Sequence, residues 1–307
     1  MSTPSGVIAV LACLEPDLAG LETVFKRLHG QVDGLVLVDN GSSHTTHVAL
    51  RTLLAQAAKG LAITPILQTQ NTGLGDAQNC GIRAALDQGA RQILLLDQDS
   101  RPAPDMVRTL QKALREAHTK GLRVAAIGPQ YVEPHRDARK SSQTQAKAQV
   151  KIQAKTPAVT LKPIPAIIAS GALIPADVLR DIGLFDETLF IDLLDTEWCF
   201  RARAAGYGCF VAPAAQMTHR IGDQVLRLGG RDRAVHAPFR SYYQIRNLLL
   251  LARRPHVPKL WVARELAVML PRALVIAALV PPRRQRAILP LLGLWHGILG
   301  RSGRLRD

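Results

Sequence analysis

The first part of the chain alternates short apolar runs with longer amphipathic segments. The apolar runs lie at 7–11, 34–38, 63–67, 93–96 and 124–128. Continuous apolar runs of this length are typical of buried strands. Helices are expected between them, at 18–28, 48–58, 72–86 and 107–117. Strands that alternate with helices at short spacing predict βαβ units and a largely parallel sheet, so the expected fold class is α/β.

The composition permits a sizeable core. Of the 307 residues, 47% are hydrophobic, which fits one large domain or one domain with a helical appendage. The four cysteines are scattered and form no C-x-x-C pair. This pattern indicates reduced thiols and argues against a disulfide framework or a cysteine zinc site. The N-terminal residues lack the basic start and apolar stretch of a secretory signal, so we expect a cytoplasmic protein.

The positive charge is concentrated in the last third of the chain. The net charge is +15, and residues 218–307 hold 17 Lys and Arg against 4 Asp and Glu. This bias predicts a negatively charged partner, such as nucleic acid, an anionic membrane surface or a phosphorylated substrate. Aromatic residues make up only 4% of the chain, and no motif interleaves them with arginines. No nucleic acid partner is therefore expected.

Two segments depart from the alternating pattern. Residues 135–162 are rich in Lys, Arg, Gln, Ser and Thr and predict a mobile basic loop. Residues 260–299 are apolar but are interrupted at Pro281-Pro282-Arg283-Arg284, so no transmembrane helix is expected. They predict basic amphipathic helices that either lie on an anionic membrane surface, peripherally on its inner face, or pack on the preceding domain. We expect one domain at 1–235 and a helical, basic region at 236–307.

Two carboxylates follow the apolar run 93–96 directly, in Asp97-Gln98-Asp99-Ser100. At the end of a parallel strand they would emerge at the carboxyl edge of the sheet, where open α/β folds place their ligands. Acidic oxygen ligands suit Mg²⁺ or Mn²⁺, which are usually shared with substrate phosphates. The structural alternative is a polar turn in which Asp99 or Ser100 caps the next helix.

Polar side chains also follow the neighbouring predicted strands. Asp39-Asn40-Gly41-Ser42 could bind a nucleobase or ribose at the same sheet edge, or could simply form a turn. The glycine-rich segment 71–81 precedes a helix, where small residues and the helix N-terminus favour phosphate. It matches neither a dinucleotide fingerprint nor a P-loop, and its alternative is a helix start with a tight packing contact.

A second acidic centre lies in the segment 185–201. Asp192, Asp195 and Glu197 stand among apolar residues, and a carboxylate next to a substrate hydroxyl can act as a general base. The alternative is that these acids sit at a helix start, where the macrodipole favours them. His219 comes later and is either structural or a further metal ligand.

In this order the segments resemble family 2 glycosyltransferases of the GT-A fold, over residues 7–246. The motifs that carry the resemblance are Val38-Asp39-Asn40-Gly41-Ser42, Asn71-x-Gly73-x-Gly75-x-Ala77-x-Asn79-x-Gly81, Leu96-Asp97-Gln98-Asp99-Ser100, Ser170-Gly171, the acidic segment ending in Arg201, and His219. Within that family the chain looks like the bacterial rhamnosyltransferase branch, on Gly183-x-Phe185-Asp186-Glu187, His219-x-x-Gly222 and Arg240-x-Tyr242-Tyr243-x-x-Arg246-Asn247. The resemblance implies transfer of L-rhamnose from dTDP-L-rhamnose, with inversion, to a glycan that is usually lipid-linked, such as an O-antigen precursor.

Carried over by position, the resemblance also implies roles for individual residues. Asp39 and Asn40 would bind base and ribose, Asp97 the ribose or a metal-bound water, and Asp99 the Mg²⁺ or Mn²⁺ that bridges the diphosphate. The other implied contacts with the nucleotide sugar are Asn71, Gly73 and Asn79, and those with diphosphate or acceptor are Arg240, Tyr243 and Arg246. Asp195 would deprotonate the acceptor hydroxyl, and His219 would join the metal or diphosphate site.

Other functions remain open at this point. Within the same class the donor could carry galactofuranose or glucose instead of rhamnose. A non-catalytic protein that binds a nucleotide sugar, or a basic protein that binds nucleic acid, is a more distant alternative.

Overall fold

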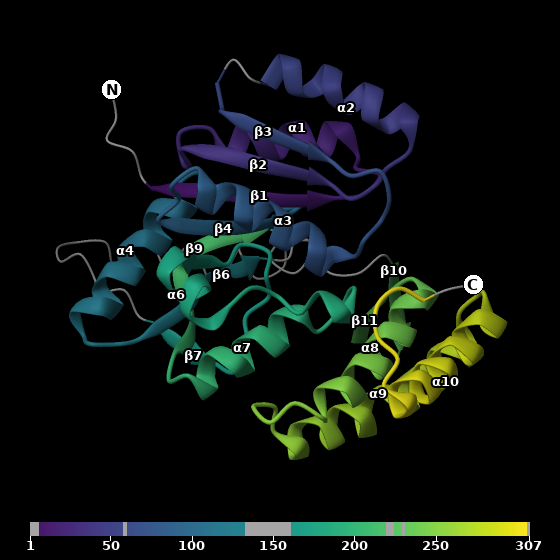
Figure 1. Ribbon diagram of the computed structural model, residues 1–307. Helices are drawn as coiled ribbons and strands as arrows, with labels where there is room; N and C mark the ends of the chain where they lie inside the picture. The colour runs from purple at the N-terminus through teal and green to yellow at the C-terminus, as the bar shows by residue number, and fades with distance from the viewer. Residues whose placement is uncertain (1–5, 58–59, 133–160, 219–223, 229–230, 306–307) are drawn as a thin grey trace.

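The computed structural model describes residues 6–57, 60–132, 161–218, 224–228 and 231–305 (Figure 1). The strands are β1 (Val7–Cys13), β2 (Gly34–Asp39), β3 (Ile63–Leu67), β4 (Gln92–Asp97), β5 (Arg101–Pro102), β6 (Val124–Val132), β7 (Lys162–Ile164), β8 (Leu173–Pro175), β9 (Gly208–Thr218), β10 (Gln224–Leu228) and β11 (Arg231–Val235). The helices are α1 (Leu18–Leu28), α2 (His44–Ala57), α3 (Leu74–Asp87), α4 (Met106–Thr119), α6 (Ala176–Ile182), the short 3-10 helix η2 (Glu187–Leu189), α7 (Leu194–Ala204), α8 (Pro238–Leu251), α9 (Lys259–Leu279) and α10 (Arg283–Leu299).

A nine-stranded sheet forms the centre of the molecule. Its order is β3-β2-β1-β4-β8-β6-β9-β5, and β7 pairs with β9. The pairs β1–β2, β1–β4, β2–β3 and β6–β9 are parallel, whereas β8, β5 and β7 run antiparallel to their neighbours. The predicted α/β class with a mostly parallel sheet is confirmed, and the antiparallel strands are short. Strands β10 and β11 form a separate hairpin.

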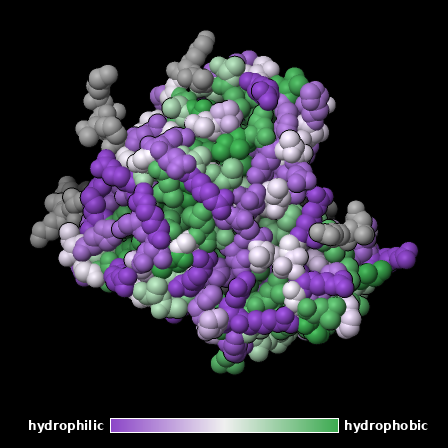
Figure 2. All heavy atoms as spheres, viewed as in Figure 1, coloured by the Kyte–Doolittle hydropathy of each residue, from purple (hydrophilic) through white to green (hydrophobic). Residues whose placement is uncertain are grey.

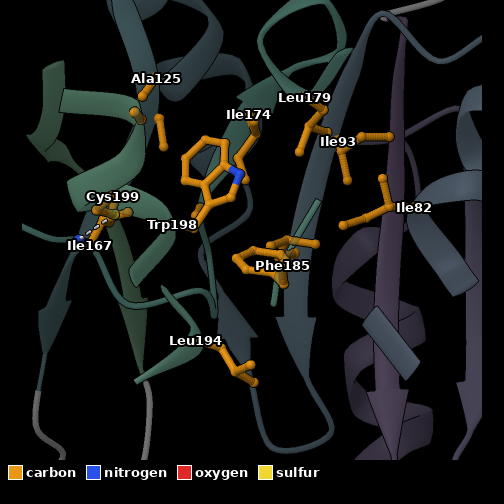
Figure 3. Packing of buried hydrophobic residues seen from close by; sticks show 14 of the residues in the cluster. Ile82, Ile93, Ala125, Ile167, Ile174, Leu179, Phe185, Leu194, Trp198 and Cys199 are labelled. Atoms are coloured by element: carbon orange, nitrogen blue, oxygen red, sulfur yellow. Dashed lines mark hydrogen bonds between the residues drawn. The ribbon is translucent and has the colours of Figure 1, made fainter. Parts of the chain in front are cut away.

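Helices cover both faces of the sheet, so the side chains on both sides of its central strands are buried. Alternate residues of β1 enter two buried clusters, with Val7, Ala9 and Leu11 in one and Ile8, Val10 and Ala12 in the other. The first cluster includes side chains from α1, α2 and α4, and the second includes side chains from α3 and α7. Figure 3 shows part of the second cluster, where the Trp198 indole of α7 lies among aliphatic side chains of the sheet and α6.

Two predicted boundaries change. The first helix after β2 begins at His44 rather than near residue 48. The expected basic loop at 135–162 falls mostly outside the described residues, but its last residue, Lys162, starts β7 and pairs with Val211 of β9. The end of that predicted loop was therefore wrong, because the chain there extends an edge of the sheet.

Three helices end the chain beside the sheet domain (Figure 1). The predicted break between the last two is confirmed, since α9 ends at Leu279 and α10 begins at Arg283 after Pro281-Pro282. Among the described helices, none combines the length and the apolar character needed to cross a bilayer. The helices contact the sheet domain through Trp261, which packs edge-on against Phe200 of α7, and through His256, which lies 2.8 Å from Glu197.

Gly81 permits a close contact between α3 and the sheet, and its replacement tests that packing. A Cβ at Gly81 would overlap Cγ1 of Val10 and lie 3.1 Å from Cγ2 of Val38. We expect Gly81→Ala to lower the free energy of unfolding by about 1–3 kcal/mol, because overpacking outweighs the gain in helix propensity. Urea unfolding measures the change. Gly34→Ala is the control, since its Cβ would meet only the Ala62 carbonyl at 3.5 Å; an equal loss in both variants would contradict the argument.

Candidate active site

Asp97 and Asp99 stand half-buried at the carboxyl end of β4, on a turn fixed by Ser100. The backbone N–H of Ser100 donates to the Asp97 carbonyl at 3.1 Å, and the N–H of Asp97 donates to Ser100 Oγ at 2.9 Å. Gln98 Oε1 accepts a 3.0 Å hydrogen bond from the N–H of Leu14, which ties this turn to the loop after β1. Ser100 thus forms the polar turn, but neither Asp99 nor Ser100 caps the next helix, since α4 begins at Met106 after Asp105. The two carboxylates remain partly accessible at the edge of the sheet.

A segment before β8 connects this turn to the second acidic centre. Ser170 Oγ lies 2.7 Å from Ser100 Oγ, and both serines are buried. One residue earlier, the N–H of Ala169 donates to Asp195 Oδ2 at 3.3 Å. The structure thus brings Asp97 and Asp195, almost a hundred residues apart in sequence, to the same site.

Tyr131, near the end of β6, also belongs to this site. Its hydroxyl donates to the Ser170 carbonyl at 2.5 Å. Burial raises the pKa of Tyr131 well above its ordinary value, and the negative charges of Asp97 and Asp195 raise it further. The sequence did not reveal this residue, because the apolar run that predicts β6 ends at Gly128 and gave no sign that the strand continues to Val132.

Asp195 lies in the first turn of α7, as the macrodipole favours. Burial raises the pKa of its carboxyl group, and the nearby charge of Asp192 adds to this effect. Hydrogen bonds from the backbone of Thr196, at 2.7 Å, and of Ala169 act in the opposite direction. A partly desolvated carboxylate beside another carboxylate is a candidate general base.

The backbone that leads into α7 is strained. Phe190, Asp192 and Leu193 have φ angles of 65°, 66° and 63°, in the left-handed region that residues with a Cβ rarely adopt. Each such residue costs on the order of 1–3 kcal/mol and persists only when its surroundings enforce it. The segment 189–193 therefore needs external support.

Helix α8 supplies that support through its polar side chains. The Asn247 side-chain amide donates to the carbonyls of Leu189, Ile191 and Asp192 at 3.1, 2.8 and 2.8 Å. Arg240 pairs with both carboxylate oxygens of Asp192, at 2.5 and 3.1 Å. Sequence reasoning missed the part played by Asn247, whose only signal is its position beside Arg246 in the resemblance motif.

Arg240, Tyr243 and Arg246, predicted to contact the diphosphate or the acceptor, have partners within the protein itself. Arg246 is 1% exposed and donates to the carbonyls of Leu189 and Gly303, and Tyr243 is 3% exposed and accepts from the N–H of Leu305. Their polar groups are directed at the protein's own backbone, and their contacts with a diphosphate or an acceptor stay predictions. Arg240 is half-buried and engaged with Asp192. The three residues hold the segment 189–193 and the C-terminal residues against α8.

The glycine-rich segment also has a packing role where a ligand contact was predicted. Gly73 has φ 103°, and a Cβ there would lie 2.6 Å from the Phe190 ring. The N–H of Leu74, at the start of α3, donates to the Phe190 carbonyl at 2.7 Å, so the chain itself occupies this helix N-terminus. Asn79 is 1% exposed and exchanges hydrogen bonds with the Phe185 backbone. These two residues therefore have packing roles, and their contacts with a nucleotide sugar stay predictions.

The turn after β2 is organised by its own aspartate. Asp39 is fully buried, accepts from the N–H of Ser42 at 2.8 Å and lies 2.7 Å from His47 Nε2. Asn40 Oδ1 accepts from the N–H of Thr72 at 3.0 Å, and its amide donates to Asn71 Oδ1 at 3.2 Å. The turn interpretation is confirmed for Asp39. Contacts of Asp39, Asn40 and Asn71 with a nucleotide stay predictions, and Asn71 is the most accessible of the three.

His219, predicted as a metal or diphosphate ligand, lies outside the described residues. The preceding residue, Thr218, pairs with Arg101 of β5, two positions after Asp99. Strand β9 therefore ends beside the Asp97–Asp99 turn. Within the described ranges no group of three or more His, Cys, Asp or Glu side chains could hold a metal ion.

Comparisons with known proteins identify the family of the chain. A family model described as "Glycosyl transferase family 2" matches residues 8–183. The chain is 30% identical over 305 residues to the dTDP-rhamnosyl transferase RfbF of Shigella flexneri, and the match covers 97% of both proteins.

Solved structures share the fold at low sequence identity. The mannosyltransferase PcManGT of Pyrobaculum calidifontis, in complex with GDP-Man and Mn²⁺, has a TM-score of 0.57 at 17% identity, over 98% of this chain and 89% of that chain. GalNAc-T7 with UDP, GalNAc and Mn²⁺ has a TM-score of 0.56 at 14% identity, over 95% of this chain and 56% of that chain. At these identities the likeness shows the fold alone.

Removal of the Asn247 side-chain amide tests the support of the strained segment. We expect Asn247→Ala to lower the free energy of unfolding by about 2–3 kcal/mol, because the carbonyls of Ile191 and Asp192 lose this donor in a poorly hydrated site. Gln244→Ala on the same helix is the matched control, since Gln244 makes only a 3.5 Å contact with Asp192. Its effect should stay within about 0.5 kcal/mol. Equal unfolding curves for Asn247→Ala and the unaltered protein would refute the assigned support.

Proposed function

This chain belongs to glycosyl transferase family 2, and from that premise we propose that it transfers L-rhamnose from dTDP-L-rhamnose to a hydroxyl group of a glycan acceptor, with inversion at the sugar carbon. It has the GT-A fold that its family membership implies. The near full-length match to a dTDP-rhamnosyl transferase supports rhamnose as the sugar and dTDP as the carrier. A lipid-linked precursor of a cell-surface polysaccharide is the proposed acceptor.

One observation carries the reaction type. Ser170 joins two acidic centres, with Ser100 of the Asp97–Asp99 turn on one side and, through Ala169, Asp195 on the other. A transfer with inversion requires stabilisation of a leaving diphosphate and removal of a proton from the incoming hydroxyl. We assign the diphosphate to the Asp97–Asp99 turn and the removal of the proton to Asp195.

The donor side suits a divalent cation. Asp97 and Asp99 offer carboxylate oxygens at a partly open edge, and Mg²⁺ and Mn²⁺ commonly use one or two carboxylates together with substrate phosphates. Asp99 is the proposed ligand, Asp97 the second carboxylate, and His219 a further candidate beside them. When bound, the cation would neutralise charge on the departing nucleoside diphosphate.

Asp195 is the proposed general base. The 2.7 Å hydrogen bond from Thr196 holds Oδ1, while Oδ2, among the described residues, accepts the longer 3.3 Å bond from Ala169. Oδ2 is therefore the oxygen better able to receive a proton from the acceptor hydroxyl. The raised pKa of this carboxyl group brings its basicity closer to that needed at neutral pH.

A donor panel tests the proposal. With Mn²⁺ or Mg²⁺ present, dTDP-rhamnose should raise the melting temperature and support transfer, whereas UDP-galactofuranose and UDP-glucose should do neither. Asp99→Ala should abolish the metal-dependent shift, because the cation loses a carboxylate ligand. Asp87→Asn, an exposed acid at the end of α3, is the matched control and should behave as the unaltered protein. A rise in melting temperature with a UDP-sugar and none with dTDP-rhamnose would reject dTDP-rhamnose as the donor. It would leave the assignment as a glycosyltransferase in place.

The pH dependence of turnover tests the base. Asp195 must be deprotonated to act, and its pKa is raised from the ordinary 3.8, so turnover should fall as the pH decreases through a value above 3.8. Asp195→Asn should lower kcat by about 10²–10⁴-fold and remove this acid limb, since general-base assistance is lost. Donor binding, measured by calorimetry, should be retained. Near-normal turnover of Asp195→Asn would show that another group is the base.

A further inference from the structure

The last two helices expose large apolar side chains to solvent. Leu260 is 83% exposed, Leu274 65%, Leu291 59% and Trp295 57%. Further exposed apolar residues on the same helices are Val268, Val275, Leu279, Ile288, Ile298 and Leu299. Figure 2 shows hydrophobic atoms at the surface in the lower right, over the region of the C-terminal helices in Figure 1, with hydrophilic atoms between them. The exposed apolar side chains are thus concentrated on one structural unit.

These side chains form an outer stripe on each helix. On α10, Gly293 and Gly297 face α8: a Cβ at Gly293 would overlap the Tyr242 carbonyl, and one at Gly297 would lie 3.1 Å from the Arg246 carbonyl. Leu291 and Trp295 are each two residues from Gly293 and therefore point to the opposite side of the helix. On α9 the exposed apolar positions recur every three or four residues from Leu260 to Leu279. We name these two stripes the outer face of α9 and α10.

Cationic side chains accompany the outer face. From Leu266 to Arg306 the sequence holds seven arginines and neither aspartate nor glutamate. Arg283 and Arg284 are exposed at the start of α10, and Arg272 is exposed on α9. Exposed apolar residues that include a tryptophan, combined with arginines, are typical of helices that lie in the interface of an anionic bilayer.

We propose that the outer face of α9 and α10 docks on an anionic lipid bilayer, with both helices parallel to its surface. The apolar side chains would enter the headgroup boundary, and the arginines would contact lipid phosphates. A second copy of this chain fits the face less well, because it would bring the same uncompensated positive charge against it. A neutral membrane would offer the exposed arginines no net negative charge.

The contacts of α10 give this docking a consequence for the catalytic side. Gly293 and Gly297 place α10 directly on the backbone of α8, and α8 holds the segment that leads to Asp195 through Asn247 and Arg240. A docked outer face would therefore fix the orientation of the sheet domain relative to the bilayer. The docking itself does not depend on which sugar the protein transfers.

Sedimentation of the full-length protein with lipid vesicles tests the proposal. We expect binding to phosphatidylcholine vesicles that contain phosphatidylglycerol, and at least about tenfold weaker binding to phosphatidylcholine alone or at high salt, because each arginine near an anionic surface adds attraction. Arg283→Gln with Arg284→Gln should weaken binding to the anionic vesicles. Leu291→Gln with Trp295→Gln should weaken binding both to the anionic vesicles and to phosphatidylcholine alone. Circular dichroism checks that each variant is folded.

Matched controls lie on the sheet domain. Val48 is 54% exposed on α2 and Arg115 is exposed on α4, so Val48→Gln and Arg115→Gln should leave vesicle binding unchanged. Binding that is unaffected by both outer-face variants would overturn the proposal. A second result would also overturn it: the unaltered protein is a dimer that does not bind vesicles, and Leu291→Gln with Trp295→Gln converts it to a monomer. A second copy of the chain would then cover the outer face.

Discussion

The hydrogen bonds from Asn247 to the backbone carbonyls of residues 189–192 are the interaction on which the candidate base depends. The segment before α7 contains three residues with positive φ, and its strain must be offset by contacts from outside. Helix α8 provides them, and it is held in turn by the C-terminal residues through Arg246 and Tyr243. The last part of the chain is therefore a structural requirement of the site that carries Asp195.

The sheet and its carboxyl edge could be predicted because they follow from short-range patterns. Apolar runs of strand length identify β1 to β4, and parallel pairing then requires that residues after these strands share one edge. This reasoning placed Asp39 and the Asp97–Asp99 turn correctly, since both follow paired strands. It could not show Ser170 or Tyr131 as part of the site, because their positions depend on an antiparallel strand and on an extension of β6 beyond its apolar run.

Three polar residues of the resemblance motifs share a physical property. Asn79, Tyr243 and Arg246 carry polar groups that are buried in the structure and satisfied by backbone groups distant in sequence. A polar residue in a motif gives no indication of whether its partner is a ligand or a carbonyl group a hundred residues away. Buried polar groups must be hydrogen-bonded in either case, so sequence alone cannot separate the two.

Hydrogen bonds to backbone carbonyls also connect helix α8 to the segment before Asp195. A site that depends on packing of apolar side chains alone would tolerate small displacements of α8, since dispersion contacts are weakly directional. Hydrogen bonds to carbonyls have narrow geometric limits. Because α8 contacts the base segment through such bonds and contacts α10 through close backbone approach at Gly293, a displacement of the C-terminal helices would be transmitted to the backbone before Asp195. Helix α8 therefore links the C-terminal helices to the segment that leads into Asp195, through close backbone contact on one side and directional hydrogen bonds on the other.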